Sequence, residues 1–353
     1  MARSILIMAG GTGGHIFPAL AVADILKNQG WQVTWLGAPG SMEAELVPKH
    51  GIDMQMVRFS GLRGKGTLRK LMLPVNLLVA MWQSAAAMFR VRPDVVLGMG
   101  GYITFPGGLM ATMLGMPLVI HEQNSVAGLS NRVLAKIAKK VMSGFPGVLP
   151  DAIWCGNPVR SAISALDEPS QRYGARAGRL KVLVVGGSLG AKALNEAMPA
   201  ALAKLPEELR PEVLHQTGKN HFDAVVNSYK NAGVSADIRP FIDDMAQSYA
   251  DADLVICRSG ALTVAELAAA GVASLLVPYP FAVDDHQTGN TKFLSSHGAA
   301  ILQPQAELDA GKLAQLLGDL TRDRLAAMAQ QARMLGKADA AEAVANICRE
   351  VAE

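Results

Sequence analysis

The sequence predicts an α/β protein with two Rossmann-like domains, each a parallel sheet covered by helices. Three observations support this. The chain has 353 residues, more than one ordinary core uses. Short apolar runs ending in glycine-rich or polar turns alternate with stretches of helical periodicity. This pattern begins at residue 5 and restarts near residue 180.

In the first half, an apolar strand over residues 5–8 runs into the glycine turn Gly10–Gly14. A helix is predicted from about Pro18 to Gly30, because apolar residues recur at helical spacing and a glycine follows. Further strands are predicted over residues 32–36, 94–98 and 117–120.

In the second half, a strand over residues 180–185 leads into the turn Gly186–Ala191 and a helix over about 193–205. Later strands are predicted at 212–215, 236–240, 254–257 and 274–277. An Asn-Pro turn near residues 157–160 marks the boundary, so the expected domains are 1–160 and 161–337. The terminal segment 338–353, with a helix to about 351, is a candidate to pack back on the first domain.

Composition excludes several classes of protein. Thirty-three basic and 30 acidic residues give a net charge of +3, and aromatic residues are 5%, which disfavours nucleic-acid binding. The three cysteines are Cys155, Cys257 and Cys348, without a CxxC pair, as is typical of a reducing compartment. The apolar run at residues 5–9 is too short for a signal peptide, so a cytoplasmic location is expected.

One uncharged stretch, residues 71–89, is long enough to span a bilayer. Pro74, Asn76 and several alanines interrupt it, and it lies between two βα patterns that share one sheet, so a spanning helix is rejected. Two interpretations remain: a core helix, or an amphipathic helix on the membrane surface.

Three glycine-rich turns follow predicted strands: Gly10–Gly14, Gly98–Gly101 and Gly186–Gly190. Such turns present backbone N–H groups and a helix dipole to an anion. Their spacing does not match the dinucleotide fingerprint, because Ile16 and Ser188 stand where glycines belong. No GxxxxGK[ST] occurs either, so dehydrogenases and P-loop NTPases are disfavoured.

The motifs together resemble the bacterial MurG family, which adds N-acetylglucosamine to undecaprenyl-diphosphate-muramyl-pentapeptide (lipid I) to form lipid II. They are GGTGGHIFP at 10–18, GMGGY at 98–102, HEQN at 121–124 and GGSLGA at 186–191. The resemblance implies a GT-B fold, with two domains facing a cleft, and an inverting hexosyltransferase without a cofactor, working in cell-wall synthesis. It also implies UDP-N-acetylglucosamine and lipid I as substrates, and a peripheral position on an anionic surface, the cytoplasmic face of the inner membrane. Other cell-wall synthesis or division proteins are further candidate partners.

The resemblance also places donor-binding residues in the second domain. Ser188 and its turn would meet the diphosphate of UDP, Arg160 would neutralise the leaving group, and Ile242 would contact uracil through its backbone. The helix start Ala261, Leu262, Thr263, Val264 and Ala265 is expected to bind the donor, and the N–H groups of Leu262 and Thr263 suit its phosphate. Glu266 is expected to accept the ribose hydroxyls, or to act as a first-turn acid that favours the helix dipole. Gln287 would bond sugar hydroxyls, although His286 stands where the family shows another glutamine.

Asp251 and Asp253 have the Asp-x-Asp spacing of a metal site. They directly precede an apolar strand, so a loop-terminating role is favoured and no metal is expected.

On the acceptor side, His15 and Glu122 are rival candidates for the general base, and His15 is alternatively a hydrogen-bonding residue only. Tyr102, Asn124 and Asn131 resemble family positions that line the cleft, for the acceptor diphosphate or the donor sugar. Thr12, Gly13 and Gly14 would bound the same space, with their N–H groups facing an anion. The apolar residues of segment 71–82 are candidates for a membrane patch surrounded by Arg63, Lys65, Arg69, Lys70, Lys136, Lys139 and Lys140. The alternatives are a related transferase with another lipid acceptor, a UDP-sugar epimerase and a non-catalytic UDP-sugar-binding subunit.

Overall fold

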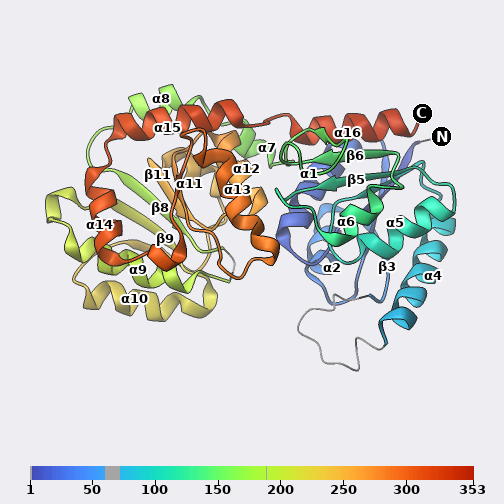
Figure 1. The fold of residues 1–353 in the computed structure, drawn as a ribbon, viewed down its shortest axis with the longest axis horizontal. Helices are drawn as coiled ribbons and strands as arrows, with labels where there is room; N and C mark the ends of the chain where they lie inside the picture. The colour runs from blue at the N-terminus through green and yellow to red at the C-terminus, as the bar shows by residue number, and fades with distance from the viewer. Residues whose placement is uncertain (1, 60–71, 188) are drawn as a thin grey trace. The chain divides into compact units, whose positions relative to one another are not determined.

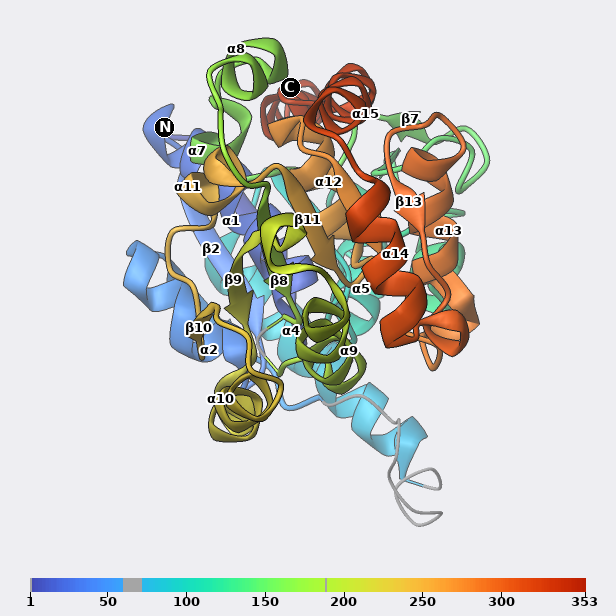
Figure 2. The same ribbon diagram turned by 90° about the vertical axis from the view of Figure 1, so that its left-hand side faces the viewer.

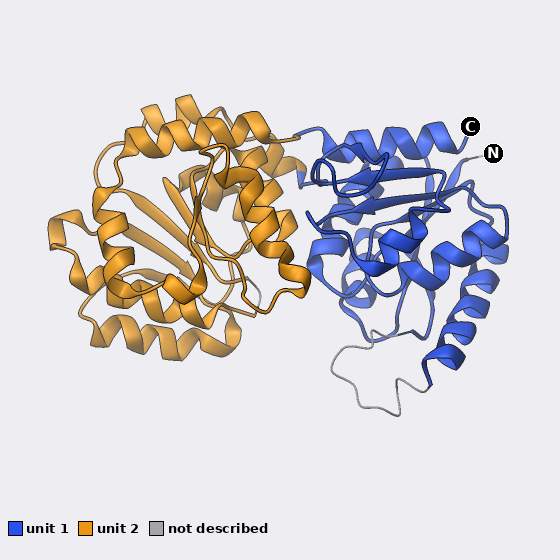
Figure 3. Ribbon diagram, in the orientation of Figure 1, with its two compact units in different colours: residues 1–160, 338–353 blue, residues 161–337 orange. Residues whose placement is uncertain are grey.

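The computed structural model describes residues 2–59, 72–187 and 189–353. The chain divides into two compact units, residues 1–160 with 338–353 and residues 161–337 (Figure 3). Each unit is a parallel sheet between helices, so the prediction of two Rossmann-like α/β halves is confirmed.

Unit 1 holds a seven-stranded sheet in the order β3-β2-β1-β4-β5-β6-β7. The strands are β1 (Ser4–Met8), β2 (Gln32–Gly37), β3 (Asp53–Met56), β4 (Val95–Gly98), β5 (Leu118–Glu122), β6 (Lys140–Ser143) and β7 (Ile153–Trp154). Strands β3 and β6, which contain polar residues, and the two-residue strand β7 were not predicted. Residues of β1 alternate between two cores, with Ile5 and Ile7 in one and Leu6 and Met8 in the other. Both faces of this sheet are therefore buried, as expected of a doubly wound sheet.

The helices of unit 1 cover these two faces. They are α1 (Gly13–Asn28), α2 (Met42–Leu46), the 3₁₀ helix η1 (Val47–His50), α4 (Leu73–Val91), α5 (Thr104–Met113), α6 (Leu129–Leu134) and α16 (Ala340–Val351). Helix α1 begins at Gly13 rather than at Pro18 as predicted, so the glycines form its first turn. The apolar periodicity starts only after that turn, which is why the pattern missed it.

Helix α16 belongs to unit 1 although it ends the chain. Figure 1 shows it alongside α1. Val344, Ala345, Cys348 and Val351 are buried in the same core as Ile5.

Unit 2 has six strands in the order β10-β9-β8-β11-β12-β13, the strand order of the dinucleotide-binding folds. The strands are β8 (Lys181–Val185), β9 (Glu212–Gln216), β10 (Asp237–Arg239), β11 (Leu254–Cys257), β12 (Ser274–Leu276) and β13 (Ile301–Leu302). Only the two-residue strand β13 was not predicted. Unit 1 repeats this order in its first six strands, which confirms the predicted internal duplication.

Helices cover the sheet of unit 2 in two layers (Figures 1 and 2). One layer contains α9 (Lys192–Lys204), α10 (Phe222–Asn231) and α14 (Ala310–Asp319). The other contains α7 (Ser161–Ser164), α8 (Pro169–Gly174), α11 (Met245–Asp251), α12 (Ala261–Ala270) and α15 (Arg322–Leu335). Helix α13 (His286–Ser295) and the 3₁₀ helices η2 (Glu207–Leu209), η3 (Lys219–His221), η4 (Val283–Asp285) and η5 (Gln305–Glu307) complete the unit.

Helix α4 corresponds to the uncharged stretch and packs on its unit through a narrow stripe of Ala80, Ser84, Ala87 and Met88. Its larger side chains point away from the core. Met72, Val75, Leu78, Val79, Trp82 and Phe89 are all exposed, Trp82 by 71% and Leu78 by 66%. One face of α4 thus belongs to the core, and the role of its exposed apolar face on a membrane stays a prediction. Among the described residues, no helix has the length and apolarity needed to cross a bilayer.

Candidate active site

The first glycine turn connects β1 to α1 at the carboxyl edge of its sheet. Thr12 is the N-cap, and its carbonyl accepts the N–H groups of His15 at 3.0 Å and Ile16 at 3.2 Å. The N–H groups of Gly13 and Gly14 belong to the open first turn, where a helix offers donors to an anion. The predicted residues Thr12, Gly13, Gly14 and His15 are thus brought together.

Part of this turn already holds an internal carboxylate. Glu43 of α2 is fully buried, and it accepts the N–H groups of Gly11 and Ala38, each at 3.2 Å. Burial together with the charge and hydrogen bond of Glu43 raises the pKa of Tyr102. A Cβ on Gly10 would lie 2.7 Å from Oε1 of Glu43, so this end of the turn is closed. Sequence reasoning missed Glu43, because no motif marks it.

The second glycine turn packs against the first. Gly100 and Gly101 have φ of +89° and +86°, a region that favours glycine. A Cβ on Gly101 would lie 2.1 Å from the carbonyl oxygen of Gly10. Close packing therefore requires these glycines, and anion binding by this turn stays a prediction.

His15 begins a series of hydrogen-bonded side chains. Its Nδ1 lies 2.8 Å from Oε1 of Gln123, whose Nε2 lies 3.0 Å from Nδ1 of His121. His121 is fully buried, and this burial lowers its pKa to about 4 despite opposing contributions from Gly156 and Glu122. His121 is therefore neutral near pH 7. Sequence reasoning quoted Gln123 and His121 only as part of a motif.

Glu122, the rival base, is buried and accepts four hydrogen bonds. Oε1 accepts from the backbone and side chain of Asn124, at 3.0 and 3.3 Å. Oε2 accepts from the N–H of Gly128 at 3.1 Å and from Nδ2 of Asn131 at 2.8 Å. This carboxylate thereby ties the loop of the predicted residue Asn124 to α6, which carries the predicted residue Asn131.

In unit 2, the third glycine turn connects β8 to α9. Ser188 lies outside the described residues. Gly190 has a φ of +78°, and a Cβ there would lie 2.1 Å from the carbonyl oxygen of Thr217. A cavity of about 550 Å³ opens beside the turn, lined by Gly186, Gly187, Leu189, Gly190, Ala191, Lys192, Ala193, Glu196, Arg258, Tyr279, Gln287 and Gln305.

Arg258 is a cation that lines this cavity, and the sequence analysis assigned no role to it. Its guanidinium donates to the carbonyls of Val277 and Pro278 at 3.1 and 3.2 Å, and to Oε1 of Gln305 at 2.6 Å. It also lies over the ring of Tyr279, 5.5 Å from the ring centre. Burial lowers its pKa, but an arginine guanidinium remains charged at neutral pH. A held cation beside a glycine turn suits a diphosphate.

Gln287 connects the neighbouring strand ends. Its Oε1 accepts the N–H groups of Ser259 at 3.3 Å and Tyr279 at 2.9 Å, and sugar binding by its amide nitrogen stays a prediction. His286 precedes it at the first position of α13, and its Nδ1 lies 2.7 Å from the carbonyl oxygen of Val283. Because a carbonyl only accepts, Nδ1 carries a proton, and Nε2 is an acceptor whenever this ring is neutral.

Helix α12 begins at Ala261 after the N-cap Gly260, without a side-chain cap. Its first turn contains the predicted residues Leu262 and Thr263, whereas the N–H of Val264 donates to the carbonyl of Gly260 at 2.9 Å. Ala265 follows in the second turn. Glu266 lies beyond the first turn as well, so its interpretation as a first-turn acid is wrong. It is buried, and Tyr249 donates to its Oε2 at 3.2 Å.

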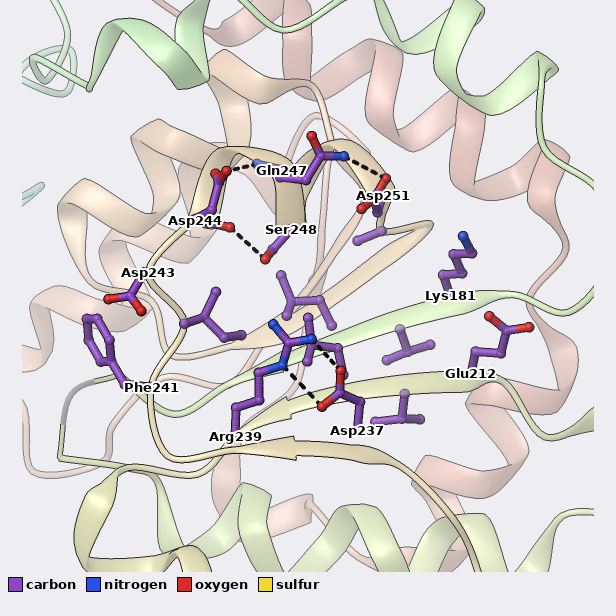
Figure 4. Close-up of a pocket in the computed structure, with 16 residues that line it drawn as sticks. Lys181, Glu212, Asp237, Arg239, Phe241, Asp243, Asp244, Gln247, Ser248 and Asp251 are labelled. Atoms are coloured by element: carbon purple, nitrogen blue, oxygen red, sulfur yellow. Dashed lines mark hydrogen bonds and ion pairs between the residues drawn. The ribbon is translucent and has the colours of Figure 1, made fainter.

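A second cavity of unit 2, about 700 Å³, runs along β8, β9 and β10 to the predicted uracil contact Ile242. Figure 4 shows its charged lining, five carboxylates and two cations: Glu212, Asp237, Asp243, Asp244 and Asp251 with Lys181 and Arg239. This excess of negative charge makes the cavity a poor diphosphate site.

The N–H of Ile242 already donates to Oε1 of Gln216 at 3.1 Å. Arg160, the other predicted UDP contact, is exposed at the end of the unit 1 segment.

The Asp-x-Asp pair separates into two different environments. Asp253 is fully buried, with Arg176 at 2.8 Å and Arg322 at 3.3 Å. Burial opposes its ionisation, but hydrogen bonds from Arg322, the N–H of Lys181 and Arg176 outweigh that effect and lower its pKa. Asp251 is exposed and accepts from Gln247. Asp253 is thus committed to a structural ion pair.

Comparison with known proteins covers both units. Residues 5–143 match the N-terminal domain model of glycosyltransferase family 28, and residues 181–344 match its C-terminal domain model. The chain is 61% identical over 351 residues, 99% of both proteins, to the UDP-N-acetylglucosamine–N-acetylmuramyl-(pentapeptide) pyrophosphoryl-undecaprenol N-acetylglucosamine transferase of Azoarcus sp. (strain BH72). The Cupriavidus metallidurans protein of the same name is 60% identical over 99% of both chains.

Among solved structures, Acinetobacter baumannii MurG superposes with a TM-score of 0.87 at 42% identity, over 99% of both chains. Identity at this level along both units shows the family as well as the fold. The chain therefore belongs to glycosyltransferase family 28, among its MurG-type N-acetylglucosamine transferases.

Proposed function

We propose that this chain transfers N-acetylglucosamine from UDP-N-acetylglucosamine to lipid I, with inversion, to form lipid II. The observation that carries the proposal is the cavity where the Gly186–Gly190 turn, Arg258 and Gln287 meet, in a chain 61% identical to a transferase of that name. Unit 2 would bind the donor and unit 1 the acceptor.

On the donor side, the chain would place positive potential around the diphosphate of UDP, where negative charge develops as UDP leaves. The C1–O bond to UDP breaks, and UDP departs with the electron pair. The first turn of α12, the Gly186–Gly190 turn, Arg258 and Arg160 would stabilise the diphosphate without a metal ion. Glu266 would accept hydrogen bonds from the ribose hydroxyls, and the amide nitrogen of Gln287 would donate one to a sugar oxygen.

On the acceptor side, His15 would take the proton of the muramyl hydroxyl as its oxygen attacks C1. Glu122 is the weaker candidate, because four donors occupy both of its oxygens.

We also propose that unit 1 rests on an anionic membrane surface through α4. Its exposed apolar face would enter the interfacial region, and Lys136 would contribute roughly 1 kcal/mol near an anionic leaflet. Two other predicted cations are partly committed, since Lys140 pairs with Glu350 at 3.2 Å and Lys139 donates to the carbonyl of Val351 at 3.3 Å. Arg63, Lys65, Arg69, Lys70 and Leu71 lie outside the described residues.

The decisive measurement is UDP release with lipid I against a panel of other lipid acceptors, using chelator-washed enzyme. We expect release only with lipid I. Release with another acceptor would indicate a related transferase, and an epimerised UDP-sugar without acceptor would indicate an epimerase. Donor binding without turnover would indicate a binding subunit, and loss of turnover on chelation would refute the metal-free proposal.

The two candidate bases are separated by comparing His15→Ala with Glu122→Gln. We expect His15→Ala to lower kcat about 10²–10⁴-fold. Unchanged kcat in His15→Ala, with weaker acceptor binding, would assign His15 to binding only.

A further inference from the structure

We propose that Gln123 and His121 are positioning residues that hold His15 in one tautomer, with the proton on Nδ1 and the lone pair on Nε2. This inference rests on the proposed function only for the role of His15 as base. The arrangement itself follows from which groups in the series are able to donate.

The series ends on a backbone carbonyl. Nε2 of His121 lies 2.9 Å from the carbonyl oxygen of Gly156. A carbonyl only accepts, so this nitrogen carries a hydrogen. Burial keeps the ring of His121 neutral, with a pKa lowered to about 4, so it has a single N–H. Its Nδ1 is therefore an acceptor.

A second backbone carbonyl sets the amide of Gln123. Its Nε2 lies 3.0 Å from Nδ1 of His121 and 3.0 Å from the carbonyl oxygen of His121. Both of these are acceptors, so the amide nitrogen must face them, and the opposite orientation would set oxygen against two acceptors. Oε1 of Gln123 consequently faces Nδ1 of His15, 2.8 Å away. An amide oxygen only accepts, so Nδ1 of His15 donates and Nε2 keeps its lone pair.

Gly100 gives this series the room that it needs. A Cβ at Gly100 would lie 2.6 Å from Nδ1 of His15 and 3.0 Å from Oε1 of Gln123. The glycine therefore covers the bond between the two side chains, where any larger residue would push them apart. The second glycine turn thus acquires a role that anion binding does not explain.

The consequence for catalysis is a base that needs no rearrangement. Nε2 takes the proton of the attacking hydroxyl, while Nδ1–H continues to donate to Gln123. A His15 freed from Gln123 would divide between two tautomers, and only one of them has a lone pair on Nε2.

Nitrogen NMR of the intact protein labelled in its seven histidines tests the tautomers directly. At about pH 9, well above the ordinary histidine pKa of about 6.5, we expect N–H-type Nδ1 and bare Nε2 for His15, and the reverse for His121. His15→Gln and His121→Gln assign the signals. A His15 protonated on Nε2 in the wild type would overturn the inference.

Gln123→Met provides the kinetic test, because it keeps the side-chain volume and removes the amide. We expect a mixture of His15 tautomers and a kcat lower by about 10- to 100-fold, less than the full contribution of a base. The KM for UDP-N-acetylglucosamine should stay within about twofold. An unchanged kcat or an unchanged His15 signal would refute the positioning role.

A matched control exists in unit 2. Tyr229→Phe removes a hydroxyl 2.9 Å from Nδ1 of the buried His215, and it should leave kcat and the His15 signals unchanged. If Gln123→Met does not fold, Gly100→Ala perturbs the same bond and should mix the same tautomers. Retained turnover in His15→Ala would refute the base assignment, whereas the NMR result would still decide the positioning of His15.

Discussion

Trp82 offers the sharpest test of whether this enzyme binds the membrane surface through α4. Its side chain is 71% exposed on α4. A tryptophan buries about 150–250 Å², so about 110–180 Å² remains available to a membrane. At about 25 cal/mol per Å², complete insertion would contribute about 2.7–4.4 kcal/mol, and half insertion about 1.3–2.2 kcal/mol. For half insertion, which we expect of a side chain at the membrane interface, Trp82→Ala should weaken binding to vesicles about 10- to 40-fold.

The assay is co-sedimentation with vesicles of neutral and anionic phospholipid, with thermal unfolding measured in parallel. Because the side chain is exposed, the free energy of unfolding should change by less than about 0.5 kcal/mol. Met334→Ala is the control, since Met334 is 63% exposed on α15 of the other unit. Equal vesicle binding by wild type and Trp82→Ala would refute the membrane role of α4, and so would an equal loss in Met334→Ala.

Three further variants test the interior of the molecule. Asp253→Asn should lower the free energy of unfolding at pH 7 by about 3–5 kcal/mol, because two arginines lose their charge partner. Since the folded-state pKa of Asp253 is lowered, its stabilisation is present above about pH 3.9 and is lost as the pH falls through the folded value. In denaturant titrations, the difference in free energy of unfolding between wild type and Asp253→Asn should therefore shrink in acid. Gly190→Ala places a Cβ 2.1 Å from a carbonyl oxygen, so calorimetry should show weaker UDP binding and a stability loss of at least about 1–3 kcal/mol. Glu122→Gln should cost about 1–3 kcal/mol in thermal unfolding yet keep kcat within about tenfold; a larger fall in kcat would restore Glu122 as a base.

Apolar periodicity and glycine punctuation predicted most of the fold. The buried strands β1, β4, β8 and β11 are largely continuous apolar runs, so they can be recognised without knowledge of the tertiary structure. Strands β3 and β6 were missed because polar residues interrupt their apolar ones, and β7 was missed because a two-residue strand resembles a loop.

Sequence patterns were enough to predict the two Rossmann-like units, the family and the approximate positions of the glycine turns. The groups that occupy those turns became known only from the folded chain. Glu43 is separated from Gly11 by about thirty residues, and Gln123 from His15 by more than a hundred, yet each pair is hydrogen-bonded. Such pairings arise because parallel strands bring the carboxyl ends of distant segments to one edge. Local patterns carry no record of which side chains meet there, nor of which nitrogen of a histidine holds the proton.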